Sequence, residues 1–394
     1  MTQTAGMTVA RRDDFDIAIV GAGIVGLAHA LAAARRGLKV VLFDRDQQAN
    51  GASIRNFGFV TVTGQRDGLP WQRARFSRDV WDRVAPAAGI AVLQQGLTVT
   101  ARHPQAMDVL AAFAETEMGV ECRLLGKAEI ERHLPMAAAT TVGGLFSPHE
   151  RRIESSTAIP KLAAWLEATQ GIRFLRGVAV QQVADGEVVC GAGRFTAQKI
   201  VVCPGADLVT LFPDRLASHR LALCKLQMVR LAAPGWRLPH IVMSDLSLVR
   251  YDGYRQMKGA SALRQILNKE AGDALDHGVH LIVVQSADGS LVVGDSHHYA
   301  ATPDPFASDL VERIILREAR KILDLPPELP VVERWIGAYP SSDQHTAILD
   351  QVSSDILLAI VSSGTGMSTA FALGEEGIAL LLGEGVPSYP DPGR

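Results

Sequence analysis

Cysteine is scarce in this chain of 394 residues, which has four cysteines and no Cys-x-x-Cys pair. The scarcity argues against a disulfide-stapled scaffold and against the usual cysteine-based metal sites. We therefore expect reduced, buried thiols in a cytoplasmic protein, and we expect no metal-binding residues.

Long runs of apolar residues and of basic residues are also missing. The apolar stretches are interrupted well before the roughly 18 residues that a membrane-spanning helix needs. The polar segment 1–14 lacks the apolar core of a signal peptide. Lys and Arg form no long run, and the formal net charge is −3. The sequence therefore predicts no membrane span, no signal peptide and no nucleic-acid partner.

A glycine-rich turn near the start is the most informative motif. Gly21, Gly23 and Gly26 follow an apolar stretch and precede an alanine-rich one, which predicts a strand, a tight turn and a helix. In a dinucleotide-binding turn, these glycines permit the turn, the approach of a pyrophosphate and close helix packing. The pyrophosphate would lie at the helix N-terminus, where free N–H groups favour an anion.

An acidic residue supports this interpretation. Asp44 ends the next predicted strand, 18 positions after Gly26, close to the spacing of a carboxylate that accepts ribose hydroxyls. The pattern predicts a Rossmann-like nucleotide-binding domain. We assign these residues to it: Gly21, Ala22, Gly23, Ile24, Val25, Gly26, Asp44 and Arg45.

The rest of the chain, long enough for two or three domains, is predicted to mix strands and helices. Residues 50–70 are Gly-rich and are predicted to form a loop. Helices are expected near 72–85, 105–118 and 308–323, and after the glycine motif at 362–369 as far as about Leu382. Strands are expected near 173–180, 187–190, 194–197, 199–205, 223–231, 240–250, 280–285, 290–294 and 355–361, those between 223 and 294 in an antiparallel sheet.

A second glycine motif of this kind is missing, because Gly191 and Gly193 lack a third glycine after them. Only one dinucleotide site is therefore visible. Two interpretations remain. The nucleotide is either a nicotinamide hydride carrier that binds and dissociates, or an FAD that the substrate reduces directly.

Five segments, in this order, resemble the D-amino-acid oxidase superfamily of FAD-dependent amine oxidoreductases, which includes glycine oxidase and sarcosine oxidase. They are the turn with Asp44, the strand at Val178, Val201-Val-Cys-Pro-Gly205, Lys225-Leu-Gln227 and Ser363-Gly-Thr-Gly-Met367. The resemblance places Val178 beside the adenine and Gly205 at the cofactor.

This resemblance also implies the fold class, which is α/β with an α+β substrate domain. A Rossmann-like FAD-binding domain is interleaved with a substrate domain built on an antiparallel sheet. The FAD-binding segments would be 14–75, 149–220 and 335–390, and the substrate-domain segments 76–148 and 221–334.

The C-terminal glycine motif has a physical logic of its own. Glycines at a helix N-terminus let backbone N–H groups approach the flavin N1–C2=O2 edge, where negative charge develops on reduction. The alternative is an ordinary turn capped by Ser or Thr. The resemblance assigns to FAD the residues Gly364, Thr365, Gly366, Met367 and Ser368.

The loop over 51–65 occupies the place where the family lays a segment along the flavin. The resemblance assigns to FAD the residues Ala52, Ser53, Asn56, Phe57 and Gly58. The segment Ser-x-Arg-Asn-Phe-Gly at 53–58 resembles the corresponding segment of a subgroup linked to the breakdown of aminoethylphosphonates and their N-methyl forms. The alternative is a generic flavin loop.

One position departs from the family. Tyr339 stands where amino-acid oxidases of the family carry an arginine that clamps the substrate carboxylate. The departure argues against a simple α-amino acid and favours an anion that hydroxyl groups can bind, such as a phosphonate. We expect catalytic roles for His297, Tyr339 and Arg55, and substrate contacts from Ser341, Ser342, His298 and Trp335. His297 or His298 would bind an anion or act as a base; alternatively, one histidine faces the core and the other faces solvent.

The resemblance implies transfer of a hydride from a small primary or secondary amine to flavin N5, followed by hydrolysis of the imine. An (N-methyl) 2-aminoethylphosphonate would give phosphonoacetaldehyde, and oxygen or an electron acceptor would reoxidise a non-covalent FAD. The competing substrates are glycine, sarcosine or a 2-hydroxy acid. Two competing functions are a flavin hydroxylase, suggested by Gly294-Asp295, and a non-catalytic FAD subunit.

Overall fold

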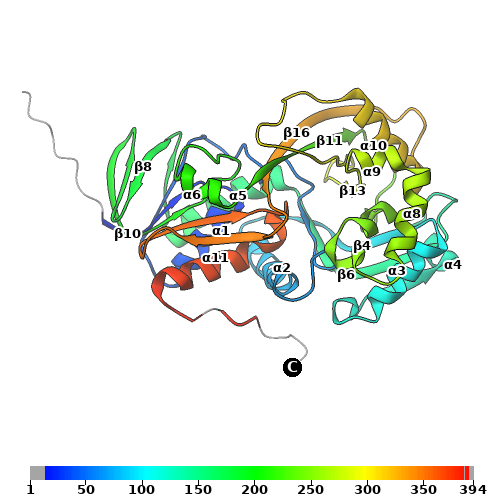
Figure 1. The fold of residues 1–394 in the computed structure, drawn as a ribbon, viewed down its shortest axis with the longest axis horizontal. Coiled ribbons are helices and arrows are strands. Elements are labelled where there is room, and N and C mark those ends of the chain that lie inside the picture. The colour runs from blue at the N-terminus through cyan, green and yellow to red at the C-terminus, as the bar shows by residue number, and fades with distance from the viewer. Residues whose placement is uncertain (1–13, 386, 390–394) are drawn as a thin grey trace, which may run out of the picture.

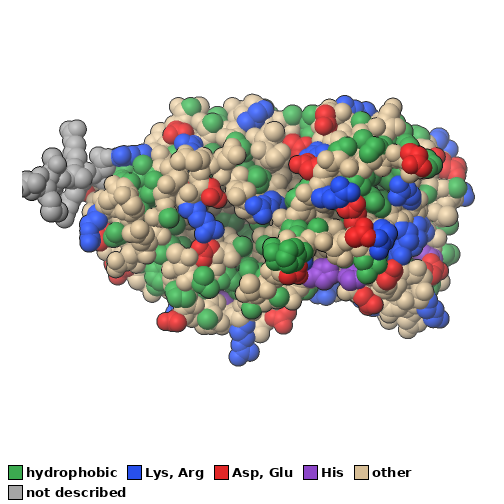
Figure 2. Space-filling model, turned by 90° about the horizontal axis from the view of Figure 1, so that it is seen from above, with side chains coloured by type: hydrophobic (Ala, Val, Ile, Leu, Met, Phe, Trp, Pro, Cys, Tyr) green, Lys and Arg blue, Asp and Glu red, His purple; other side chains and the backbone are tan. Residues whose placement is uncertain are grey.

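The computed structural model describes residues 14–385 and 387–389. The chain forms two lobes side by side, each built on its own sheet (Figure 1). Basic and acidic side chains are interspersed over the face in Figure 2, in keeping with 39 Lys and Arg against 42 Asp and Glu in the chain. In the described residues, no helix combines the length and apolarity needed to cross a membrane.

The first lobe contains a mainly parallel sheet in the order β17-β18-β10-β1-β2-β7, with a β8–β9 hairpin extending from β10. The strands are β1 (Asp14–Val20), β2 (Val40–Asp44), β7 (Arg173–Arg176), β8 (Val180–Ala184), β9 (Glu187–Cys190), β10 (Gly193–Val202), β17 (Ala347–Gln351) and β18 (Ile356–Val361). The apolar runs of β1 and β18 are buried on both faces, which is why they lack an alternating pattern.

Helices cover this sheet. They are α1 (Ile24–Arg35), α2 (Leu69–Ala87), α5 (Ser155–Gln170), α6 (Pro213–Ser218) and α11 (Gly366–Leu382). Ile17 and Ile19 of β1 belong to the apolar cluster that includes α1 and α11, whereas Ala18 belongs to the cluster on the other face. Gly374 lets α11 approach α1 closely, since a Cβ there would lie 2.6 Å from the backbone of Ala28.

The second lobe contains a mostly antiparallel sheet in the order β15-β11-β14-β13-β12-β4-β6-β3, with β16 beside β11 and β5 beside β6. Its strands are β3 (Phe59–Val60), β4 (Val92–Ala101), β5 (Arg123–Gly126), β6 (Gly143–Ile153), β11 (Ala222–Leu231), β12 (Ile241–Met243), β13 (Ile282–Gln285), β14 (Leu291–Gly294), β15 (His298–Ala300) and β16 (Val331–Ser341). Its helices are α3 (Pro104–Ala114), α4 (Lys127–His133), α7 (Asp252–Arg255), α8 (Ala260–Glu270), α9 (Gly272–Asp276) and α10 (Asp309–Ile322), with short 3-10 helices η1 (Glu117–Gly119) and η2 (Asp245–Val249).

The predicted fold class is confirmed, as are the strands expected near 223–231, 280–285, 290–294 and 355–361. The prediction of a strand over 240–250 is wrong beyond Met243, because η2 follows there and buries the apolar residues of 245–249. The loop expected over 50–70 contains the short strand β3 and the first residues of α2. The five-segment domain division stays a prediction; β3 and β16, which it places in FAD-binding segments, pair within the second sheet.

Candidate active site

The glycine turn after β1 has the geometry that its sequence predicts. Gly21 adopts φ +99°, a conformation that favours glycine. A Cβ on Gly26 would overlap the carbonyl oxygen of Gly21, so the third glycine permits close packing of α1 on the turn. The Asp44 carboxylate accepts hydrogen bonds from the N–H groups of Ala22, at 2.6 Å, and Asp46, at 2.8 Å. The acidic residue therefore also orders the turn.

Two adjoining cavities extend from this turn into the second lobe. The dinucleotide cavity is lined by Gly21, Asp44, Arg45, Val178 and other residues around the ends of β1, β2 and β10. The inner cavity is lined by residues of α1, the 52–61 loop, the end of β18 and the second sheet. Gly23, Ser53, Arg55 and Gly205 line both cavities, so the two are continuous.

Most residues predicted for FAD line this continuous cavity. They are Gly21, Gly23, Ile24, Val25, Gly26, Asp44, Arg45, Ala52, Ser53, Asn56, Phe57, Val178, Gly205, Gly364, Thr365, Gly366, Met367 and Ser368. Ala22 and Gly58 do not line it. The N–H of Ala22 instead donates a hydrogen bond to Asp44, which lines the cavity. Gly58 has φ +63°, and a Cβ there would overlap the carbonyl oxygen of Ile153. Two continuous cavities, one of them lined by the glycine turn, fit a dinucleotide.

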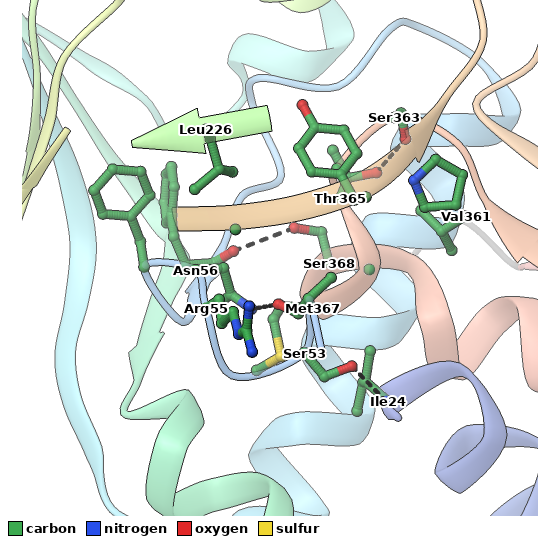
Figure 3. Close-up of a pocket in the computed structure, with 18 of the residues that line it drawn as sticks. Ile24, Ser53, Arg55, Asn56, Leu226, Val361, Ser363, Thr365, Met367 and Ser368 are labelled. Carbon is green, nitrogen blue, oxygen red and sulfur yellow. Dashed lines mark hydrogen bonds between the residues drawn. The ribbon is translucent and has the colours of Figure 1, made fainter. Parts of the chain in front are cut away.

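The walls of the inner cavity are tied together by side-chain hydrogen bonds. Ser53 Oγ accepts a hydrogen bond from the Ile24 N–H at 2.9 Å and so holds the 52–61 loop against the start of α1 (Figure 3). The hydroxyls of Ser363 and Thr365 lie 2.7 Å apart in the glycine turn before α11 (Figure 3). The N–H of Thr61 also donates a hydrogen bond to Ser368 Oγ at 2.9 Å, so the 52–61 loop is bonded to the starts of both α1 and α11.

Tyr339 lies against the C-terminal glycine turn. A Cβ on Gly364, which has φ +72°, would come within 2.8 Å of the Tyr339 ring. Burial raises the pKa of the Tyr339 phenol well above its ordinary value, so the hydroxyl stays protonated. Tyr339 is therefore a neutral hydrogen-bond donor placed between the turn and the second sheet.

Arg250 is a cavity residue that sequence reasoning missed. It follows η2, lines the inner cavity and donates a hydrogen bond to the Tyr299 hydroxyl at 2.9 Å. Burial lowers its pKa, but the nearby Tyr299, Tyr339 and Asp295 more than offset this, so the pKa is raised. Among the described residues, no carboxylate lies within ion-pairing distance of this guanidinium. Arg250 is thus a half-buried cation without an anionic partner.

A second polar group occupies the same cavity. His280, Asp295 and His297 are buried, at 3%, 5% and 8% exposure. His280 Nε2 lies 3.1 Å from Asp295 Oδ1, and His297 Nε2 lies 3.8 Å from Asp295 Oδ2. Burial lowers the pKa of His297 to about 3 and also lowers that of His280. Burial would raise the pKa of Asp295, but the neighbouring histidines and Arg250 lower it to about 2.

The register of the second sheet brings these residues together. His280 precedes β13 and Asp295 follows β14, and the two strands are antiparallel with Ile282 opposite Gly294. The start of one strand therefore lies beside the end of the other. A histidine just before a predicted strand and an acidic residue just after the next would have been the signal to look for.

Several residues predicted to bind substrate lie elsewhere. Ser341, Ser342, Trp335 and His298 are not among the described residues that line the inner cavity. Ser342 Oγ accepts hydrogen bonds from the backbone of 344–345, and His298 Nε2 lies 3.0 Å from His277 Nδ1. Arg55 lies where the cavities join and donates to the Asn50 side chain at 2.9 Å. Arg55 therefore borders both the dinucleotide cavity and the inner cavity, and its catalytic role stays a prediction.

A Rossmann-like lobe whose nucleotide cavity continues into an antiparallel-sheet lobe is the architecture of a class of two-domain, dinucleotide-binding proteins. Within this class, the family model described as DAO, FAD dependent oxidoreductase, matches residues 16–380. The chain belongs to this family, and the predicted resemblance is confirmed. The protein is an FAD-dependent oxidoreductase, and the prediction of FAD as its cofactor is also confirmed.

Known proteins show the same architecture. Glycine oxidase from Geobacillus kaustophilus superposes with a TM-score of 0.76 at 18% identity, covering 94% of this chain and 95% of that one. L-proline dehydrogenase from P. horikoshii gives 0.78 at 17% identity, covering 96% of each chain. The bifunctional protein ThiO/ThiG of Nostoc sp. is 22% identical over 347 residues. That match covers 85% of this chain and 47% of the relative, so the chain spans about half the relative's length.

Proposed function

We propose that the protein oxidises a small primary or secondary amine that carries an anionic group, and that the substrate is 2-aminoethylphosphonate or its N-methyl form. The observation that carries the proposal is the unpartnered guanidinium of Arg250 in the inner cavity. A half-buried guanidinium that makes no ion pair with the described carboxylates still has charge available to an anion, so such a site favours an anionic ligand.

The donors around Arg250 come from different elements. Tyr299 on β15 and Tyr339 on β16 both lie opposite Cys224 of β11, on its two sides. A guanidinium and phenol groups spread over several directions suit the three oxygens of a tetrahedral anion. A carboxylate needs only one planar fork, which Arg250 alone could provide, and an amino-acid substrate is therefore the second candidate.

The cavity walls favour the reactive form of the amine. Phe57 and Leu226 are buried apolar residues of the inner cavity. An apolar wall disfavours an ammonium ion and favours the neutral amine, which can release a hydride from its α-carbon. Bound FAD supplies the two-electron acceptor for that hydride. Arg250 and Tyr339 would hold the anionic end and fix the orientation of the carbon–nitrogen bond.

The product side follows from ordinary chemistry. The imine left by hydride loss reacts with water to give an aldehyde, with release of ammonia or methylamine. Phosphonoacetaldehyde would be the product from either phosphonate. Oxygen or a separate electron acceptor would reoxidise the reduced flavin. We propose a cytoplasmic location, in keeping with the four free cysteines.

Steady-state turnover of 2-aminoethylphosphonate and its N-methyl derivative, compared with glycine, sarcosine and D-alanine, tests this proposal. We expect a higher kcat/KM for the phosphonates. A tenfold preference for the carboxylates would instead support the second candidate, with Arg250 as a carboxylate clamp.

A further inference from the structure

The inner cavity ends in a cluster of three side chains that can each donate an electron pair to a metal ion. One nitrogen of His280, one of His297 and a carboxylate oxygen of Asp295 all lie within 4.8 Å of one another. The three side chains are more than nine-tenths buried, and all three line the cavity. Buried groups of this kind need partners, because water does not solvate them freely.

The hydrogen bonding of His297 fixes which of its nitrogens carries a proton. His297 Nδ1 lies 3.0 Å from the carbonyl oxygen of Gly278, which can only accept a hydrogen bond. Nδ1 is therefore the donor, and the neutral ring has a lone pair at Nε2. That lone pair faces the Asp295 carboxylate at 3.8 Å. Two electron-rich atoms that face each other in a buried site are stabilised by a cation between them.

Two further atoms of the cluster also lack hydrogen-bond partners. Among the described residues, neither Asp295 Oδ1 nor His280 Nδ1 has a hydrogen bond of acceptable geometry. A backbone carbonyl that orients a histidine through Nδ1, as Gly278 does for His297, is the usual support of a metal-ligating histidine.

We propose that His280, Asp295 and His297 bind one divalent metal ion of the zinc type at the end of the inner cavity. Ligands about 2.0–2.2 Å from a tetrahedral zinc ion lie about 3.4 Å apart. The contacts of 3.1 and 3.8 Å from the two histidines to Asp295 bracket that separation. Three protein ligands leave a coordination position open toward the cavity.

The open coordination position of the metal ion would accept an oxygen of the substrate's anionic group. This step rests on the proposed function, which identifies that group as a phosphonate. A phosphonate carries a charge of about −2 near neutral pH. Arg250, Asp295 and a divalent ion together carry two positive charges, so they would balance that dianion. In this arrangement His297 is a metal ligand rather than the anion-binding residue or base that the sequence predicts. The metal ion and Arg250 would bind the anion instead.

Zinc binding to the FAD-loaded protein, in the absence of any amine, tests the inference. The protein is treated with a chelator, desalted and titrated with zinc chloride in a calorimeter, and metal content is measured on the recovered protein. We expect one zinc per chain. Failure to take up zinc at micromolar concentrations would overturn the site, even if the protein still oxidises amines. Zinc uptake by a protein that oxidises no amine would leave the metal site standing and contradict the proposed function.

Substitution of single ligands shows where the zinc binds. Asp295→Asn and His297→Gln are expected to weaken zinc binding by at least about 100-fold. His298→Gln is the matched control, because this adjacent histidine pairs with His277 outside the cluster. Retention of FAD and the melting temperature show whether each variant is folded. Equal zinc affinity in the parent, Asp295→Asn and His298→Gln proteins would overturn the assignment.

Discussion

The carboxylate of Asp44 and the backbone N–H of Ala22 are joined by a hydrogen bond of 2.6 Å. This bond connects the end of β2 to the glycine turn after β1, although the residues are 22 positions apart. The same carboxylate borders the dinucleotide cavity. Asp44 therefore contributes both to the shape of the turn and to the surface that meets the nucleotide.

Replacement of Asp44 by alanine is expected to weaken FAD binding. Loss of hydrogen bonds to a charged group costs about 1–3 kcal/mol, which corresponds to a roughly 5- to 150-fold higher Kd. Asp16→Ala is the matched control, because Asp16 also accepts a backbone hydrogen bond, from Lys39 N–H at 2.7 Å, but does not line either cavity in the described structure. Fluorescence titration of the apoprotein with FAD measures both variants. An unchanged Kd in Asp44→Ala would contradict the role of this residue.

Replacement of Gly364 by alanine is expected to disturb the flavin site more than the backbone. The left-handed φ of +72° strains any other residue by about 1–2 kcal/mol, and the new Cβ would press on the Tyr339 ring. Gly383 has a similar φ of +70° but nothing within 4 Å of an added Cβ. Both variants should lose stability in thermal unfolding, Gly364→Ala more because of the added contact, and only Gly364→Ala should change the absorption spectrum of bound FAD. Identical spectra would refute the contact with Tyr339.

Replacement of Arg250 by glutamine is expected to lower kcat/KM for anionic amines. Loss of a charged donor to the anion costs about 1.5–3 kcal/mol, or roughly 10- to 150-fold. Arg250→Lys should lose less, since it keeps the charge and gives up only the planar fork. Arg255→Gln, nearby on α7 and paired with Asp252, should behave as the parent protein. A matching fall in kcat/KM for an amine without an anionic group would show that Arg250 acts on folding or on FAD instead.

Stability is expected to fall in mild acid, and His29 is one identifiable cause. Burial lowers the pKa of His29 to about 4, whereas the unfolded chain has a value near 6.5. Between these pH values the unfolded chain binds a proton that the folded chain does not, so the free energy of unfolding decreases as the pH falls. The difference amounts to about 3 kcal/mol for this residue.

The variant His29→Asn isolates that contribution. The asparagine amide can replace the imidazole Nδ1 as a donor to the Val25 carbonyl oxygen but does not titrate. Urea unfolding at pH 7 and pH 5 should show a smaller loss of stability in the variant than in the parent. Equal losses in the two proteins would mean that other groups account for the acid sensitivity.

The sequence allowed the cofactor site to be predicted more completely than the substrate site. Glycine turns are recognisable because few other residues tolerate their backbone, and Asp44 stands at a fixed distance along the chain. Arg250 and His280 gave no comparable signal, since neither residue belongs to a motif with a fixed spacing. The strand expected over 240–250 ends at Met243, and η2 then turns Arg250 into the cavity.

Proximity in sequence also misled the substrate predictions. Ser341 and Ser342 follow Tyr339 directly, yet β16 ends there and Ser342 turns to cap the next segment. His297 and His298 are adjacent but separate, with only His297 among the described cavity residues. Which of two adjacent residues lines the cavity depends on the register between strands, and a single sequence does not reveal that register.

Anaerobic mixing of the FAD-loaded protein with single amines tests the central claim most directly. The account predicts that 2-aminoethylphosphonate or its N-methyl derivative bleaches the flavin absorption without NADH or NADPH, and that Arg250→Gln slows the bleaching. Rapid bleaching by NADPH, with no reduction by any small amine, would contradict the account and favour a flavin hydroxylase.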